Sequence, residues 1–254
     1  MARKLQTLLF AAILLTLALG LSACAAIDVQ FETLVGSGKI VTEDRAVSGF
    51  DQILLAGPGD LTITQGETES LTITGDDNLM DYVQSTVDGS TLMLGIDIDD
   101  LSDVITTFRP TRLEYDLVVK DLSSLNLAGS GNASMDGLET SELILTLAGS
   151  GNITIDSLTA DRVETNLPGS GNVELSGSAP DQMVTIAGSG NYSAASLESE
   201  TTHVFIGGSG NVTVWASKDL DVNIAGSGQV DYYGSPTVKQ QILGSGEVNA
   251  LGNK

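Results

Sequence analysis

The chain carries the sequence LAGSGNITI at residues 147–155, and the Gly-Ser-Gly at the centre of this stretch occurs seven times between residues 129 and 246. Successive copies lie 18 to 20 residues apart, with their first glycines at Gly129, Gly149, Gly169, Gly188, Gly208, Gly226 and Gly244. A fixed period of this length is typical of proteins in which each repeat forms one coil of a stack. The sequence therefore predicts a solenoid.

Apolar and polar residues alternate on both sides of each Gly-Ser-Gly. The residue two positions before the first glycine is Leu or Ile in all seven copies, and a polar and then an apolar residue follow the last glycine. This alternation indicates half-buried strands. We therefore expect an all-β chain, a parallel β-helix with coils of about 18–20 residues whose strands meet at Gly-Ser-Gly corners.

The corner residues lead to two further expectations. A sharp turn within three residues favours glycine because glycine reaches positive φ without steric cost. Coils stacked about 4.8 Å apart would also bring Asn132, Asn152 and their equivalents into a ladder of paired amides.

The upstream half is less regular. Leu55 to Ile63 repeats the corner pattern around Gly57-Pro58-Gly59, and Gly36 to Ile40 reads as a degenerate first coil. We expect irregular β-coils over residues 36–120 and regular repeats over residues 121–254. Between Gly57 and Gly129 the pattern predicts strands at Ser70–Thr74, Thr91–Ile98 and Leu113–Lys120, a helical turn at Asn78–Val83, and a loop from Asp97 to Pro110.

The first two dozen residues predict export. Arg3 and Lys4 precede an apolar run from Leu8 to Leu21, and polar sequence follows after Ile27. This order is typical of a secretory signal peptide. A retained transmembrane helix is the alternative, but the run is short and no basic stop-transfer cluster follows it.

Cys24 is the only cysteine of the chain and stands at the end of the apolar run. The residues Leu21, Ser22, Ala23 and Cys24 resemble the lipobox of bacterial lipoproteins, in which cleavage before the cysteine is followed by lipidation of its thiol. We expect residues 1–23 to be the signal peptide and residues 24–35 to be a lipidated tether. Two or three acyl chains such as palmitate would hold the protein on a membrane. A chance cysteine at a conventional cleavage site is the alternative.

The charge of the chain limits its partners. Removal of residues 1–23 takes away two of the 11 Lys and Arg residues and none of the 33 Asp and Glu residues, so the mature chain has a formal charge of −24. Long-range repulsion therefore argues against nucleic acid as a partner. An acidic exterior also keeps a long β-structure soluble.

The stretches Val47–Asp51, Gly57–Gly66 and Leu71–Ile73, together with the Gly-Ser-Gly-Asn repeats, resemble the head GIN domain family. The resemblance covers roughly residues 36 to 250. It implies a right-handed β-helix on a bacterial envelope lipoprotein and a role as an adhesin domain of autotransporter type. It carries over no catalytic motif and no cofactor.

Three functions remain open. The first is a non-catalytic envelope module that binds a glycan or a protein partner along its β-surface. The second is a structural spacer of the cell envelope. The third is a polysaccharide-active enzyme that uses Asp97 and Asp99 as acid and base, with Arg109 and Arg112 as the only near pair of cations.

One acidic group is a weak candidate for a cation site, because hard cations favour clustered carboxylates. It consists of Asp97, Asp99, Asp100 and Asp103. A solvated acidic loop is the preferred interpretation, so we expect neither a metal nor a cofactor.

Overall fold

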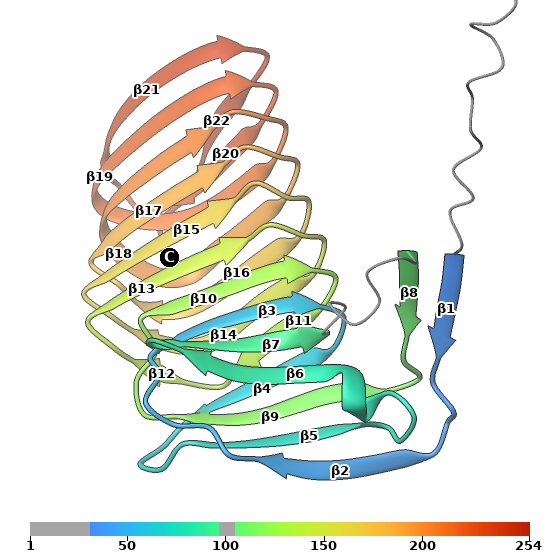
Figure 1. Cartoon of the computed structure of the whole chain (residues 1–254). Helices are drawn as coiled ribbons and strands as arrows, with labels where there is room; N and C mark the ends of the chain where they lie inside the picture. The colour runs from blue at the N-terminus through green and yellow to red at the C-terminus, as the bar shows by residue number, and fades with distance from the viewer. Residues whose placement is uncertain (1–30, 97–104) are drawn as a thin grey trace, which may run out of the picture.

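The computed structural model describes residues 31–96 and 105–254. These residues form a stack of flattened β-coils, with an antiparallel cap at the N-terminal end and a separate pair of strands beside it (Figure 1). Twenty strands are joined by hydrogen bonds into one continuous sheet. The expected all-β parallel solenoid is confirmed.

The regular part of the stack is built from thirteen strands. They are β10 (Ser124–Gly129), β11 (Asn132–Met135), β12 (Leu138–Glu139), β13 (Glu142–Leu147), β14 (Asn152–Thr159), β15 (Arg162–Leu167), β16 (Asn172–Ser178), β17 (Asp181–Ile186), β18 (Asn191–Ile206), β19 (Asn211–Gly226), β20 (Gln229–Tyr233), β21 (Thr237–Gly244) and β22 (Glu247–Gly252).

Each strand pairs in parallel with its equivalent one coil away. Leu143 lies opposite Val163, and Ile153 lies opposite Val173, so corresponding repeat positions stack directly. The apolar residue of every alternating pair points inward, and Leu145, Leu147 and Ile153 are almost fully buried. The alternation of apolar and polar residues in the sequence therefore determines which side chains form the core.

The Gly-Ser-Gly triplets lie between strands, where consecutive coils approach each other most closely. A Cβ atom added to Gly149 would lie 1.7 Å from the carbonyl oxygen of Gly129, and one added to Gly151 would lie 1.7 Å from that of Gly131. The Ser150 amide donates to the Gly129 carbonyl at 2.9 Å. Any side chain at these glycines would therefore push two hydrogen-bonded coils apart.

The expectation that these corners need positive φ is wrong for most of them. Of the seven first glycines, only Gly129 (φ 155°) and Gly244 (φ 134°) have φ in the left-handed region. The other five corners turn without it. Glycine is required there because of the close approach of the neighbouring coil, and not because of the backbone angle.

The first coils do not stack in the order of the sequence. The strands of this region are β3 (Gln52–Gly57), β4 (Asp60–Gln65), β7 (Thr91–Ile96) and β9 (Leu113–Val119). β3 and β4 pair on one side with β10 and β11, and on the other side with β7 and β9. The coil around Gly57 is therefore second in the stack, and a later segment returns beneath it.

Antiparallel strands cover the N-terminal end of the stack. They are β2 (Ile40–Arg45), β5 (Ser70–Asp76) and β6 (Val83–Asp88), with a short 3-10 helix, η1 (Met80–Tyr82). β5 pairs with β9, β2 pairs with β5, and β6 pairs with β7.

The predicted degenerate coil at Gly36–Ile40 is wrong, because Ile40 begins an antiparallel cap strand. The strand and helical-turn positions expected between Gly57 and Gly129 agree with β5, η1, β7 and β9 to within a few residues.

A two-stranded parallel sheet stands beside the cap (Figure 1). It pairs β1 (Phe31–Val35) with β8 (Ile105–Arg109). The C-terminal end of the predicted tether is thus a strand, and so is part of the predicted loop from Asp97 to Pro110. Local alternation does not reveal this pair because each strand has a partner some 70 residues away in sequence.

Asp76 fastens this sheet to the cap. Its carboxylate is almost fully buried and accepts hydrogen bonds from the Gly38 amide at 2.8 Å and from the amide and hydroxyl of Thr111 at 2.7 and 2.6 Å. Burial alone would raise the pKa of Asp76, but the hydrogen bonds from Thr111, Gly38 and Arg112 outweigh it and hold the pKa below its usual value. The carboxylate is therefore charged in the folded protein at neutral pH.

The corner geometry predicts a position-specific cost of added methyl groups. Gly149→Ala should lower the free energy of unfolding by about 3 kcal/mol or more, because its Cβ would overlap the Gly129 carbonyl. Gly137→Ala is the matched control, since its Cβ would meet only the Ser157 carbonyl oxygen at 3.7 Å. We expect that change to stay within about 0.5 kcal/mol. Urea titrations would measure both, and equal losses would contradict the close-approach explanation.

Candidate functional site

A groove runs across several coils at the turn that lies about half a coil away from each Gly-Ser-Gly. Its volume is about 780 Å³. The groove is lined by Gln65, Lys120, Asp121, Glu139, Thr140, Ser141, Thr159, Ala160, Asp161, Ser178 and Pro180. Except for Gln65, Lys120 and Asp121, these residues lie in or directly beside the turns between β12 and β13, between β14 and β15, and between β16 and β17. Stacking therefore places them in line along the solenoid axis.

Gln65 holds one end of this groove in place. Its side-chain amide donates to the Lys120 carbonyl at 3.2 Å and to the Glu139 carbonyl at 2.9 Å. Its side-chain oxygen accepts the Glu139 amide at 2.9 Å. One glutamine thus joins the end of β4 to the chain segments on both sides of it.

The groove is acidic. Asp121, Glu139 and Asp161 are exposed there, and Lys120 is the only basic residue among the lining residues. Lys120 also faces Glu69, whose carboxylate lies 3.5 Å away and is only 7% exposed. The groove therefore presents a negative potential, together with the hydroxyl groups of Thr140, Ser141, Thr159 and Ser178.

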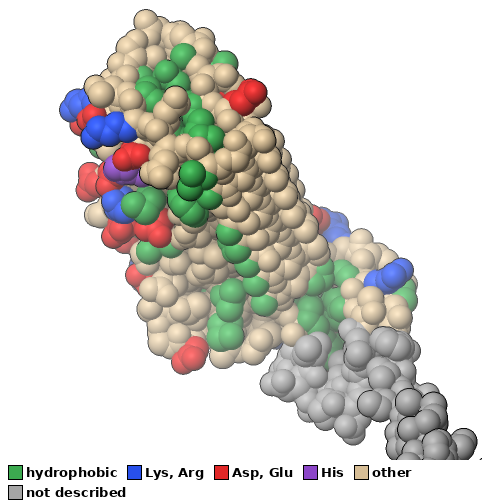
Figure 2. Space-filling model, turned by 90° about the horizontal axis from the view of Figure 1, so that it is seen from above, with side chains coloured by type: hydrophobic (Ala, Val, Ile, Leu, Met, Phe, Trp, Pro, Cys, Tyr) green, Lys and Arg blue, Asp and Glu red, His purple; other side chains and the backbone are tan. Residues whose placement is uncertain are grey.

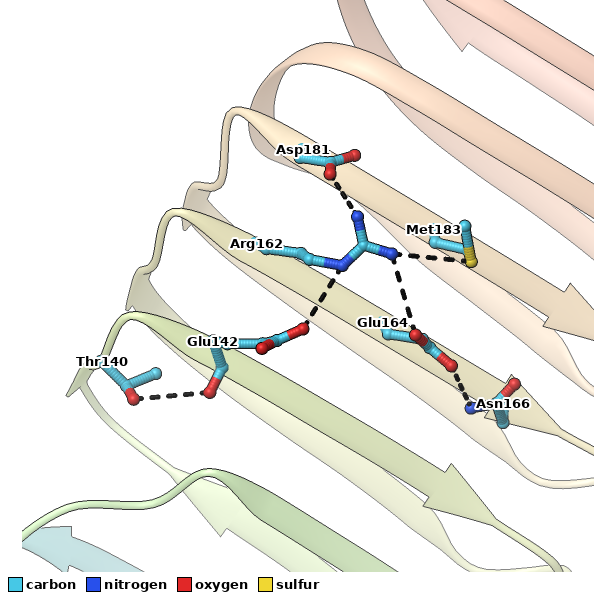
Figure 3. A network of polar contacts seen from close by, with 7 residues as sticks. All are labelled: Thr140, Glu142, Arg162, Glu164, Asn166, Asp181 and Met183. Carbon is cyan, nitrogen blue, oxygen red and sulfur yellow. Dashed lines mark hydrogen bonds and ion pairs between the residues drawn. The ribbon is translucent and has the colours of Figure 1, made fainter.

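A charge network flanks the groove on the face formed by β13, β15 and β17 (Figure 3). Arg162 lies among three carboxylates that come from three successive coils. Its guanidinium contacts Glu142 at 3.4 Å and Glu164 at 3.8 Å, and it forms a hydrogen-bonded ion pair with Asp181. Arg162 follows Asp161 directly, so the network anchors the turn that carries a groove carboxylate.

An amide ladder lies directly after the Gly-Ser-Gly corners in the chain, as the sequence predicts. The Asn132 side chain donates to Asp60 at 2.8 Å, and Asn152, Asn172, Asn191 and Asn211 each donate to the residue one coil below at 2.8 to 2.9 Å. Each of these side-chain amides donates one hydrogen bond within the ladder. The asparagines of this face therefore bond mainly to one another and not to a ligand.

A family model described as "putative auto-transporter adhesin, head GIN domain" matches residues 49–236. The chain belongs to this family. No curated protein sequence matches it significantly.

Solved structures support the same assignment. A candidate adhesin from Bacteroides fragilis is 28% identical, with a TM-score of 0.80 over 86% of this chain and 100% of that one. A candidate lipid-binding protein from Parabacteroides distasonis is 27% identical, with a TM-score of 0.75 over 87% of this chain and 100% of the other. A candidate adhesin from Parabacteroides merdae, at 23% identity and a TM-score of 0.68, shares the fold.

Most site residues predicted for this head GIN domain lie outside the described residues. These are Leu21, Ser22, Ala23 and Cys24 of the lipobox, and Asp97, Asp99, Asp100 and Asp103 of the acidic group. In the part that the structure describes, no group of three or more His, Cys, Asp or Glu residues is placed to hold a metal. Over the same residues, no helix is long and apolar enough to cross a bilayer.

The enzyme hypothesis relies on Arg109 and Arg112, and one of these two cations is already paired with a carboxylate. Arg112 forms two hydrogen bonds of 2.7 Å with Glu114, while Arg109 lies on β8 opposite Val35. The groove itself was not anticipated from the sequence. Its residues share no repeated motif, and only their common position midway between Gly-Ser-Gly triplets could have indicated that they align.

The Arg162 network predicts a salt-dependent contribution to stability. Arg162→Ala should lower the free energy of unfolding by about 1 kcal/mol at low salt, because three neighbouring carboxylates lose their shared cation. The loss should shrink in about 1 M NaCl, where charges are screened within a few ångströms. Lys218→Ala, which breaks one exposed pair with Glu200, is the control and should cost less. An Arg162 effect that is independent of salt would refute the electrostatic origin.

Proposed function

We propose that this head GIN domain is a non-catalytic binding module of the bacterial cell envelope, and that its receptor site is the groove lined by Lys120, Asp121, Glu139 and Asp161. The observation that carries the proposal is the alignment of exposed polar residues from successive turns into one continuous groove. Membership of an adhesin family supports the same assignment.

The lining chemistry favours an extended ligand that is neutral or positively charged. Three carboxylates would repel a uronic acid polymer or a phosphorylated chain at short range. The lining has hydroxyls, an amide and backbone groups but no aromatic side chain, so recognition would rest on hydrogen bonds and charge. An amino-sugar glycan has the matching chemistry, because its hydroxyls and ammonium groups recur along an extended chain.

The envelope location rests on the N-terminal sequence. Cleavage before Cys24 and acylation of its thiol would tether the solenoid to a membrane through residues 25–30, which precede β1. Dual or triple acylation gives stable attachment without a membrane-spanning segment. The partner of the groove would then be a glycan or protein of the same envelope or of a neighbouring surface.

The groove predicts selective glycan binding. The full chain should bind chitosan oligosaccharides saturably in isothermal titration calorimetry, bind neutral chitin oligosaccharides more weakly, and ignore polygalacturonate oligomers. The variant Asp121→Asn, Glu139→Gln, Asp161→Asn should lose at least about tenfold in chitosan affinity, because each screened charge contact is worth a few tenths to 1 kcal/mol.

A matched control separates the groove from the general negative charge of the chain. Asp156→Asn, Glu174→Gln, Glu198→Gln removes three exposed carboxylates from β14, β16 and β18, and none of these side chains lines the groove. This variant should bind chitosan within about twofold of the unmodified chain. Equal losses in both variants would show non-specific attraction and would count against the groove.

Lipid anchoring makes a separate prediction. Cells fed a palmitate analogue should label the unmodified chain, which should enter the detergent phase on phase separation, because acyl chains partition into micelles. Cys24→Ala should remain unlabelled and in the aqueous phase. Labelling of the Cys24→Ala chain would overturn the assignment of this cysteine.

A further inference from the structure

The two ends of the stack are finished differently. At the N-terminal end the outermost strands are antiparallel: β2 carries Glu43, Asp44 and Arg45, and β6 on the other face pairs only with β7. At the other end β21 pairs only with β19, and β22 pairs only with β20. Among residues 31–96 and 105–254, no strand covers the outer edge of β21 or of β22. Within the described residues, their outward-facing backbone groups have no strand partner, and such an edge is a template for pairing with another chain.

The residues after β22 run along the side of the stack and leave its end open. The Lys254 ammonium lies 5.6 Å from the centre of the Trp215 ring and 5.2 Å from that of Tyr233, and it donates to the Ala195 carbonyl. These contacts are with earlier coils. The described tail is thus held away from the edge of β21.

The last coil lacks the charges that usually protect a sheet edge. Residues 235–252 contain one basic residue, Lys239, and one acidic residue, Glu247, in a chain whose net charge is −22. Leu243 and Leu251 are 65% and 46% exposed in this coil. Figure 2, seen from above, shows apolar side chains exposed on the solenoid, with most of the charged side chains gathered along one side. A neutral, partly apolar edge favours association in place of repulsion.

We propose that the edges of β21 and β22 form an end-to-end interface with a second copy of this chain, related by a two-fold axis. A two-fold axis perpendicular to the sheets would pair each edge strand antiparallel with its own copy. Two copies of a charged coil would repel each other, but two copies of a coil with zero net charge do not. The neutral edge therefore favours pairing with a second copy of this chain. This inference does not depend on the groove.

The side-chain pattern fixes the register of this pairing. Inward residues must face inward residues, so only registers that keep the two-residue alternation are allowed. Val238 and Ile242 continue the interior rows, and Gln240 lies between them, stacked on the buried Val222. Pairing Gln240 with its own copy puts Val238 opposite Ile242 and lets two exposed amides bond to each other.

Charge excludes the neighbouring register. Centring the pairing on residue 239 would place Lys239 opposite its own copy, which is unfavourable for like charges. In the register centred on Gln240, Lys239 faces Gln241. On β22 the corresponding centre is Asn249, which puts Glu247 opposite Leu251. Gln240 and Asn249 flank the same corner, four residues before Gly244 and three residues after Gly246, so one axis can serve both strands.

A cysteine at the axis tests the proposal directly. In the full chain carrying Cys24→Ser, Gln240→Cys should form an intermolecular disulfide under mild oxidation, because residues facing each other across antiparallel strands have Cα atoms about 4.5–5.5 Å apart, within the range that a disulfide spans. Gln84→Cys, on the outermost antiparallel strand β6 at the other end of the stack, is the control and should remain largely monomeric on non-reducing gels. Cross-linking of the two variants at equal rates would overturn the proposal.

A second measurement keeps the test independent of cysteine chemistry. Sedimentation velocity from about 1 to 100 μM should show a monomer–dimer equilibrium for the unmodified chain. Gln240→Glu should weaken it at least tenfold by placing two carboxylates face to face, whereas Gln84→Glu adds the same charge at the other end and should leave it unchanged. Thermal melts would check that both variants fold. A monomer at every concentration would refute the interface, and so would a dimer that Gln240→Glu leaves intact.

Discussion

The structure depends on the close contact between backbone atoms of successive coils at the Gly-Ser-Gly corners. The Gly129 carbonyl occupies the position that a side chain of Gly149 would need, and the same oxygen accepts the Ser150 amide. This contact sets the coil spacing to that of paired strands. Once the spacing is fixed, the amide ladder and the interior rows beside the corners follow, because equivalent positions there stack directly, and register shifts occur only further along the strands.

Stacking also explains why the surface of this protein is organised in rows. A single polar residue in one turn would be an ordinary loop residue, but its equivalents in the next turns lie directly above and below it. The groove from Lys120 to Pro180 is one such row, the Asn ladder is another, and the Arg162 network links three coils across a third. In a ladder the polar groups bond to one another, whereas in the groove the side chains differ from coil to coil and form no ladder.

The sequence predicted the regular coils well because their information is local. The two-residue alternation around Gly149 and the spacing between triplets determine which side chains are buried, and the structure agrees. The return of β7 and β9 beneath β3 and β4 could not be predicted in this way, because strand order in a stack is a long-range property. The β1–β8 pair was missed for the same reason. Glycine was correctly expected at the corners, but for a backbone-angle reason that only Gly129 and Gly244 satisfy. The groove escaped notice because its turns contain Thr140, Asp161 and Pro180 in place of a repeated residue.

The out-of-order coil shows how the N-terminal cap relates to the rest of the molecule. The Gly66 amide donates to the Val119 carbonyl at 2.8 Å, so the two ends of segment 66–119 meet. Gly57 and Gly129 are 72 residues apart, and this segment accounts for 54 of them, leaving 18, which is also the spacing of the last repeats. The segment that carries β5 to β9 therefore has the form of an insertion within one ordinary coil, and β2 precedes it. Because the ends of this segment meet, its length can change without altering the register between the coil of β3 and β4 and the coil of β10 and β11.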